Sequence, residues 1–336
     1  MSFPNLSGFL SLAGLLSAAA AFPVHAQTTG ESPRPVRLNL VAVDSGGRPV
    51  PDLTATDVAV FDDGSRQQNV SLRLNQSEQP HPVVILFDLL NASESSRGNV
   101  WHAAKISLSH LTSTDPVYLY LLVEDGSLYP VHALPVAGAQ SVADESWIKG
   151  IGPLIDAAMR KVNQLKPEDL RASSPVAMGE RFKVTSRALD EMRALMATSR
   201  GPKELLWITY GISSNIRLVD DTWFDGTPFL RQLGTRFVQS DITVYTADPG
   251  MNLQRGILDR DSLDILTGAT GGHAYATIDL TRAVTQIEAG ARTNYSIEYL
   301  PAAKNWDGKY HKLRVTVARK GVHLQTEAGY YAVSGS

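Results

Sequence analysis

The sequence predicts an α/β fold in which a Rossmann-like, doubly wound sheet is inserted between two groups of short β-strands. Three observations support this prediction. Apolar strand segments and helical segments alternate through residues 80–291, which is typical of a parallel sheet with helices on both faces. Residues 36–79 instead alternate apolar and polar side chains between turn signals, and residues 292–336 repeat that pattern. Because either terminal group alone is too short to bury a core, we expect the two to pair into one small β-sandwich.

Residues 1–26 have the features of a cleaved secretory signal peptide. An apolar run from Phe9 to Phe22 is followed by Pro23 and by the small-x-small sequence Val24-His25-Ala26, as at a cleavage site. The run is shorter than the about 20 apolar residues that a spanning helix needs. We therefore expect a secreted or periplasmic protein that begins with a short polar linker, residues 27–35, and has no membrane span after cleavage.

The composition excludes several classes of function. An apolar content of 43% and a charged content of 19% describe an ordinary folded protein. The formal net charge of −3 provides no basic surface for nucleic acid. The chain has 0 cysteines, which excludes disulfides, cysteine-ligated metals and thiol nucleophiles.

The central stretch of the chain is His81 to Ser93. Five apolar residues, 83–87, lead into Asp88 and then into a polar turn, which indicates a buried strand that ends in a functional loop. In an open α/β sheet, ligands bind outside the carboxyl ends of such strands. Further apolar segments predict strands at 117–123, 205–209 and 242–246. Helices are expected near 100–111, 147–164, 186–197 and 263–267 and after Asp279. A long loop is expected at 166–179.

Several ordered segments resemble a known family. Asp88 opens a loop that resembles the Asp-x-Ser-x-Ser start of the metal-ion-dependent adhesion site in von Willebrand factor A (vWA) domains. The whole set is similar to a family of exported bacterial vWA-related proteins best known from acidobacteria, and its matching segments are 50–64, 86–91, 201–207, 267–272, 295–301 and 329–332. The resemblance implies a vWA-type sheet over residues 80–291 and a non-enzymatic, adhesion-type module that binds a protein partner.

The adhesion site that the resemblance implies is incomplete. Leu90 and Ala92 replace the two serines of the motif, and Tyr210 stands at the second acidic position. If Mg²⁺ binds, the available ligands are Asp88, Ser93 and Thr185, with Asn91 as a further source of oxygen. The alternative is that Asp88 caps the turn that follows it. The missing ligands favour this alternative, so we expect a degenerate site without a cofactor.

The loops at the carboxyl edge of the sheet are the expected binding surface. Its candidate residues are Asp88, Asn91, Ser93, Tyr210, Ser213, Asn215, Trp223 and Phe224. The two aromatic residues lie in an acidic loop, where they could anchor a partner or pack onto the edge of the domain.

An exported metal-dependent hydrolase is the alternative function. It would use Asp88 together with the later acidic loops around Asp220 and Asp259. The segment Gly211 to Asn215 lacks the second glycine of a nucleophile elbow, and Gly268 to Gly272 is predicted to end a helix rather than to bind phosphate. The sequence therefore favours the interaction module.

Overall fold

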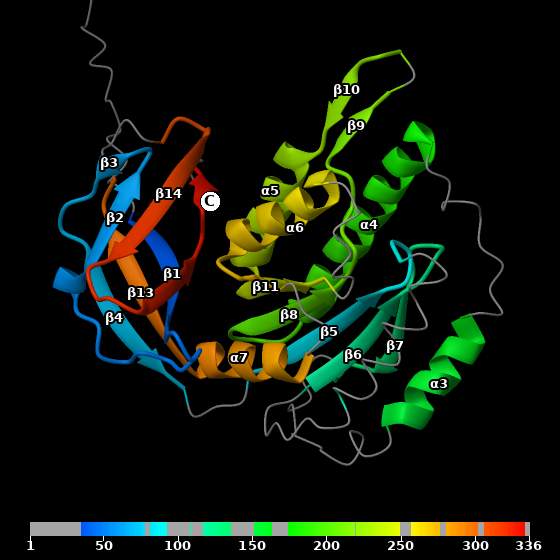
Figure 1. Cartoon of the computed structure of the whole chain (residues 1–336), viewed down its shortest axis with the longest axis horizontal. Coiled ribbons are helices and arrows are strands. Elements are labelled where there is room, and N and C mark those ends of the chain that lie inside the picture. The colour runs from blue at the N-terminus through cyan, green and yellow to red at the C-terminus, as the bar shows by residue number, and fades with distance from the viewer. Residues whose placement is uncertain are drawn as a thin grey trace, which may run out of the picture. The chain divides into compact units, whose positions relative to one another are not determined.

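The computed structural model describes residues 35–77, 81–92, 108, 117–135, 151–162, 174–218, 220–248, 257–275, 280–301 and 306–332 (Figure 1). The predicted signal peptide, Ser93, nearly all of the helix expected at 100–111 and most of the loop expected at 166–179 lie outside these residues. Within the described ranges, no helix is long and apolar enough to cross a membrane.

A six-stranded sheet forms the centre of the α/β part. Its strands, in spatial order, are β12 (Ala274–Tyr275), β11 (Ile242–Ala247), β8 (Lys203–Ile208), β5 (Val83–Asp88), β6 (Val117–Leu122) and β7 (Leu128–His132). All neighbours pair in parallel except β6 and β7, which are antiparallel. The prediction of a parallel α/β sheet is thus confirmed. The two edge strands were not predicted because β12 has only two residues and β7 contains Pro130, which is unusual inside a strand.

Helices cover both faces of this sheet. They are α3 (Ile151–Val162), α4 (Pro175–Met196), α5 (Thr227–Gln239), α6 (Ile257–Thr270) and α7 (Leu280–Arg292). Alternate residues of β5 point to opposite faces: Ile85 packs with α7 in one core, whereas Leu86 packs with α4, α5 and α6 in the other. Each residue of β5, β6 and β8 is buried, which explains why β5 and β6 are almost continuously apolar and β8 is apolar from Leu205 onward.

Helix α4 begins earlier than the sequence analysis predicted. The expected loop extended to Gly179, but the helix starts at Pro175. Ser174 caps it, because its Oγ accepts the Ala177 N–H at 3.2 Å, and proline is well suited to the first helical position. The prediction of a loop was therefore wrong from residue 175 onward.

The glycine-rich end of α6 is a helix terminus, as predicted. Gly271 has φ +78°, and the Gly272 N–H donates to the Thr267 carbonyl at 3.0 Å, which closes the last turn. The backbone of Gly272 then passes close to β11. A Cβ atom at this position would lie 1.9 Å from the Val244 carbonyl oxygen, so only glycine fits.

The terminal segments form two four-stranded sheets, referred to below as the terminal sheets. The first has the order β15 (Val322–Thr326), β1 (Val36–Asp44), β13 (Thr293–Tyr299) and β4 (Ser71–Gln76). The second has the order β16 (Gly329–Tyr331), β14 (Tyr310–Val317), β2 (Val58–Asp62) and β3 (Ser65–Arg66). A short 3₁₀ helix, η1 (Ala55–Asp57), precedes β2. Each sheet combines strands from both ends of the chain, for example through Leu38 opposite Ile297. One apolar cluster contains side chains of both sheets, among them Leu40 and Val60.

Candidate functional site

The site that the sequence singles out lies at the carboxyl end of β5. Asp88 is the last residue of that strand and is buried. Its carboxylate accepts three hydrogen bonds, from the backbone N–H of Asn91 at 2.9 Å, from the Asn91 side-chain amide at 2.7 Å and from the Thr209 hydroxyl at 2.7 Å. The first of these bonds caps the turn after the strand, as one of the two alternatives predicted.

Asn91 links Asp88 to helix α4. Its Nδ2 donates to Asp88 Oδ2 and also to Thr185 Oγ1, at 3.0 Å. Thr185 is fully buried on α4. The structure therefore brings together three of the residues that the sequence analysis named, Asp88, Asn91 and Thr185. The Asn91 amide nitrogen thus bridges a carboxylate oxygen and a hydroxyl oxygen.

Thr209 is a member of this site that sequence reasoning missed. It directly follows β8, which neighbours β5 in the sheet, so its position at the same carboxyl edge was the available signal. Besides bonding Asp88, its Oγ1 accepts the N–H of Gly211 at 3.1 Å. Burial raises the pKa of the Asp88 carboxyl group, and the hydrogen bonds from Asn91 and Thr209 oppose the shift.

The Asn91→Ala variant is expected to lower the free energy of unfolding by about 1–3 kcal/mol, because Asp88 and Thr185 lose their shared donor while they remain buried. Urea-induced unfolding at neutral pH measures the effect. The exposed Gln239→Ala at the end of α5 is the control and should shift stability by less than about 0.5 kcal/mol. Equal stability of the Asn91 variant and the wild type would show that the bridge does not stabilise the fold.

The aromatic residues predicted to bind a partner lie on a two-stranded hairpin. Strand β9 (Asn215–Arg217) pairs with β10 (Trp223–Asp225), with Phe224 opposite Ile216. Phe224 is half-buried, and its ring packs edge-on against Phe182 of α4, with centroids 5.1 Å apart. Trp223 points the other way and is 61% exposed. Phe224 therefore packs onto the edge of the domain, whereas Trp223 is exposed and available to a partner.

Exposed apolar side chains lie on both faces of this hairpin. We define the hairpin patch as Leu218, Trp223 and Phe229, all of which are exposed. Phe229 is 57% exposed in the first turn of α5, which follows the hairpin, and its ring stacks on Phe224 with centroids 6.0 Å apart. Sequence reasoning missed Phe229, since it predicted no helix at the position of α5 (Thr227–Gln239). In Figure 1 the β9–β10 hairpin extends away from α5 and α6.

The remaining predicted residues are spread around the same edge. Tyr210, Ser213 and Asn215 are half-buried between β8 and the hairpin. The acidic residues of the later loop mainly stabilise their own turns: Asp220 accepts from the Thr222 hydroxyl at 2.6 Å, and Asp225 accepts the Thr227 N–H at 2.8 Å. Their exposed carboxylates give the hairpin patch an acidic rim.

No family model matches the chain, and no curated protein sequence matches it. Solved structures similar to it include the vWF domain of the type V pili tip protein Mfa5 from Porphyromonas gingivalis, with 10% identity, a TM-score of 0.38 and coverage of 62% of this chain and 94% of that chain. Manganese-loaded Plasmodium vivax TRAP protein has 10% identity, a TM-score of 0.36 and coverage of 78% and 98%. An aerotolerance-related membrane protein from Bacteroides fragilis has 13% identity, a TM-score of 0.32 and coverage of 62% and 98%. TM-scores this low do not establish a common fold, so the chemistry of the site rests on its own geometry.

Proposed function

We propose that the chain is an exported, non-enzymatic protein-interaction module, a vWA-like domain over residues 80–291 inserted into a small β-sandwich built from residues 36–79 and 292–336. The observation that carries this proposal is the hairpin patch, in which Trp223 and Phe229 expose large aromatic side chains beside the carboxyl edge of the sheet. Exposed aromatic residues of this kind supply much of the binding energy in protein interfaces. The predicted signal peptide supports a secreted or periplasmic location.

The partner would match the chemistry of the patch. Asp220, Asp221 and Asp225 are exposed around Trp223, while Arg217 pairs with Asp221 at 3.1 Å. An apolar side chain flanked by Lys or Arg would therefore fit this surface best, since the apolar group can cover the Trp223 ring and the basic groups can face the acidic rim.

The Asp88 site would support the binding edge without a metal ion. Its carboxylate is engaged by Asn91 and Thr209, and the bridging amide links the loop after β5 to α4. In this proposal the degenerate adhesion site fixes the loop through hydrogen bonds, where a complete site would use Mg²⁺.

Trp223→Ala is expected to weaken partner binding by at least about 2 kcal/mol, the loss typical of a central aromatic anchor. Proteins of the cell envelope that the immobilised chain retains would be identified, and their affinities measured by calorimetry with the purified partner. Leu300→Ala is the matched control. Leu300 is an apolar residue that is 57% exposed, close to the 61% of Trp223, but it lies outside the hairpin. A partner that binds the Trp223 variant as tightly as the wild type would contradict the proposed surface.

A further inference from the structure

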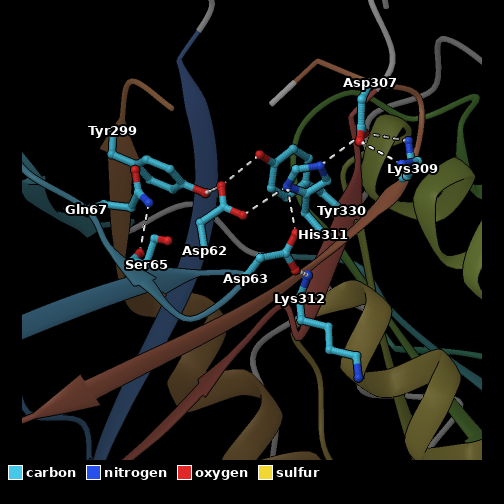
Figure 2. A network of polar contacts seen from close by, with 10 residues as sticks. All are labelled: Asp62, Asp63, Ser65, Gln67, Tyr299, Asp307, Lys309, His311, Lys312 and Tyr330. Atoms are coloured by element: carbon cyan, nitrogen blue, oxygen red, sulfur yellow. Dashed lines mark hydrogen bonds and ion pairs between the residues drawn. The ribbon is translucent and has the colours of Figure 1, made fainter. Parts of the chain in front are cut away.

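A cluster of polar side chains lies in the terminal sheets, on strands that do not belong to the six-stranded sheet of Asp88. Asp62 ends β2, Asp63 follows it in a turn, and His311 is on β14. Asp62 Oδ1 lies 3.1 Å and Asp63 Oδ2 lies 3.2 Å from His311 Nδ1. All three atoms lie within 4.8 Å of one another, and Figure 2 shows the three side chains converging.

The strand geometry directs these side chains to one point. Leu313 is opposite Asp62 in the β2–β14 pair, and His311 lies two residues from Leu313, so it is on the same buried face as Asp62. Asp63 has φ +45° and Gly64 has φ +80°, which makes the tight turn that brings the Asp63 carboxylate over the same place.

The spacing suits a metal ion. Oxygen and nitrogen ligands at about 2.0–2.2 Å from Zn²⁺ in a tetrahedral site lie roughly 3.3 Å from one another. The two separations from His311 Nδ1 are close to that value. Imidazole together with carboxylate is a donor set that suits zinc and similar transition metals better than Mg²⁺.

The second polar atom of each of these three side chains also makes a hydrogen bond. The second oxygen of Asp62 accepts the hydroxyls of Tyr299 at 3.0 Å and Tyr330 at 2.9 Å. The second oxygen of Asp63 accepts the Lys312 N–H at 2.8 Å, and His311 Nε2 lies 3.1 Å from Asp307 Oδ1. Metal ligands in proteins are oriented in this way: the second nitrogen of a ligating imidazole bonds to a carboxylate, and a ligating carboxylate accepts further hydrogen bonds.

The cluster holds more carboxylates than lysine side chains. Asp62, Asp63 and Asp307 bring three carboxylates together. Lys309 Nζ lies 3.6 Å from Asp307 Oδ2, whereas the Lys312 side chain points away from the cluster in Figure 2. The Asp62 side chain is fully buried but that of Asp63 is 53% exposed, so an ion can enter from the Asp63 side.

We propose that Asp62, Asp63 and His311 bind a divalent transition-metal ion of the zinc class. The ion joins the β2–β3 turn to β14, with a fourth position open towards solvent on the Asp63 side. The site is independent of the proposed interaction surface, because it lies on the terminal sheets and shares no residue with the hairpin patch.

The test uses the purified full-length chain after treatment with a chelator and dialysis. Calorimetric titration with ZnCl₂ is expected to show one ion per chain, and Zn²⁺ is expected to raise the thermal midpoint by several degrees. Mg²⁺ serves as the comparison ion and should bind far more weakly. Co²⁺ adds a spectroscopic readout, since ligation by an imidazole and carboxylates gives visible absorption bands.

Two variants remove ligands and two serve as controls. Asp63→Asn and His311→Gln should each weaken Zn²⁺ binding at least tenfold and abolish the Co²⁺ bands. The Asp63 variant keeps an acceptor for the Lys312 N–H in an exposed turn, so it tests the site even if the His311 variant does not fold. His323→Gln, which changes an exposed histidine on β15, and Asp88→Ala should bind Zn²⁺ as the wild type does. No Zn²⁺ binding by the wild type, or undiminished binding by Asp63→Asn, overturns the proposal.

Discussion

The Glu204→Gln variant is expected to be more stable than the wild type by several kcal/mol at pH 8, and this advantage should vanish near pH 4.5. Glu204 is buried on β8, and its Oε2 has no hydrogen-bond partner among the described residues. Burial raises the pKa of its carboxyl group from 4.5 to about 8, against the opposing effect of a hydrogen bond from Thr243.

The direction of the effect follows from proton linkage. Between pH 4.5 and about 8 the folded chain keeps the Glu204 proton, whereas the unfolded chain has released it. The folded state therefore binds more protons, so the free energy of unfolding falls as pH rises, by up to about 1.4 kcal/mol for each pH unit. Glutamine has a similar shape and cannot ionise, which removes this contribution.

Urea-induced unfolding at several pH values across that window measures the effect. Glu327, whose pKa burial raises to about 7, contributes to the wild-type slope with the same sign, so the quantity to compare is the difference between variant and wild type. Glu191→Gln, at an exposed position of α4, is the control. Parallel pH profiles for the wild type and the Glu204 variant would show that Glu204 is ionised in the folded protein.

The Gly272→Ala variant is expected to lose about 3 kcal/mol of stability, or to fail to fold, since the new methyl group would meet the Val244 carbonyl at 1.9 Å. The contact is with backbone, so it is relieved only if the end of α6 moves away from β11. Gly179→Ala on α4 is the matched control: a Cβ there meets nothing within 4 Å, and alanine should stabilise the helix by up to about 1 kcal/mol. Thermal and urea unfolding compare the two, and equal stabilities would contradict the close approach.

The parts of the fold that the sequence predicts are those with strong local patterns. The buried strand that ends at Asp88 was predictable because five apolar residues precede an acidic one. Helix α7 was expected after Asp279 and spans Leu280–Arg292. The start of α4 was not predicted, because the Pro and Ser residues that suggested a loop are also residues that begin and cap a helix.

The candidate sites were predictable only in part. The position of Thr185 near Asp88 came from the vWA resemblance and not from any local pattern, and the bridging role of Asn91 depends on a side-chain rotamer. The cluster around His311 was not foreseen, because His311 lies 249 residues from Asp62. Periodicity does not reveal which distant strands pair, so it does not bring these ligands together.

The interleaved terminal sheets have a consequence for how the chain folds during synthesis. Strands β1 and β4 do not pair with each other; both pair with β13, which begins at Thr293. Their edges therefore remain unpaired until nearly the whole chain has been made, while the parallel sheet between them can form first. Contacts of such long sequence separation slow folding and leave strand edges open to aggregation. A nascent chain that has not yet reached β13 is thus the state most in need of a chaperone.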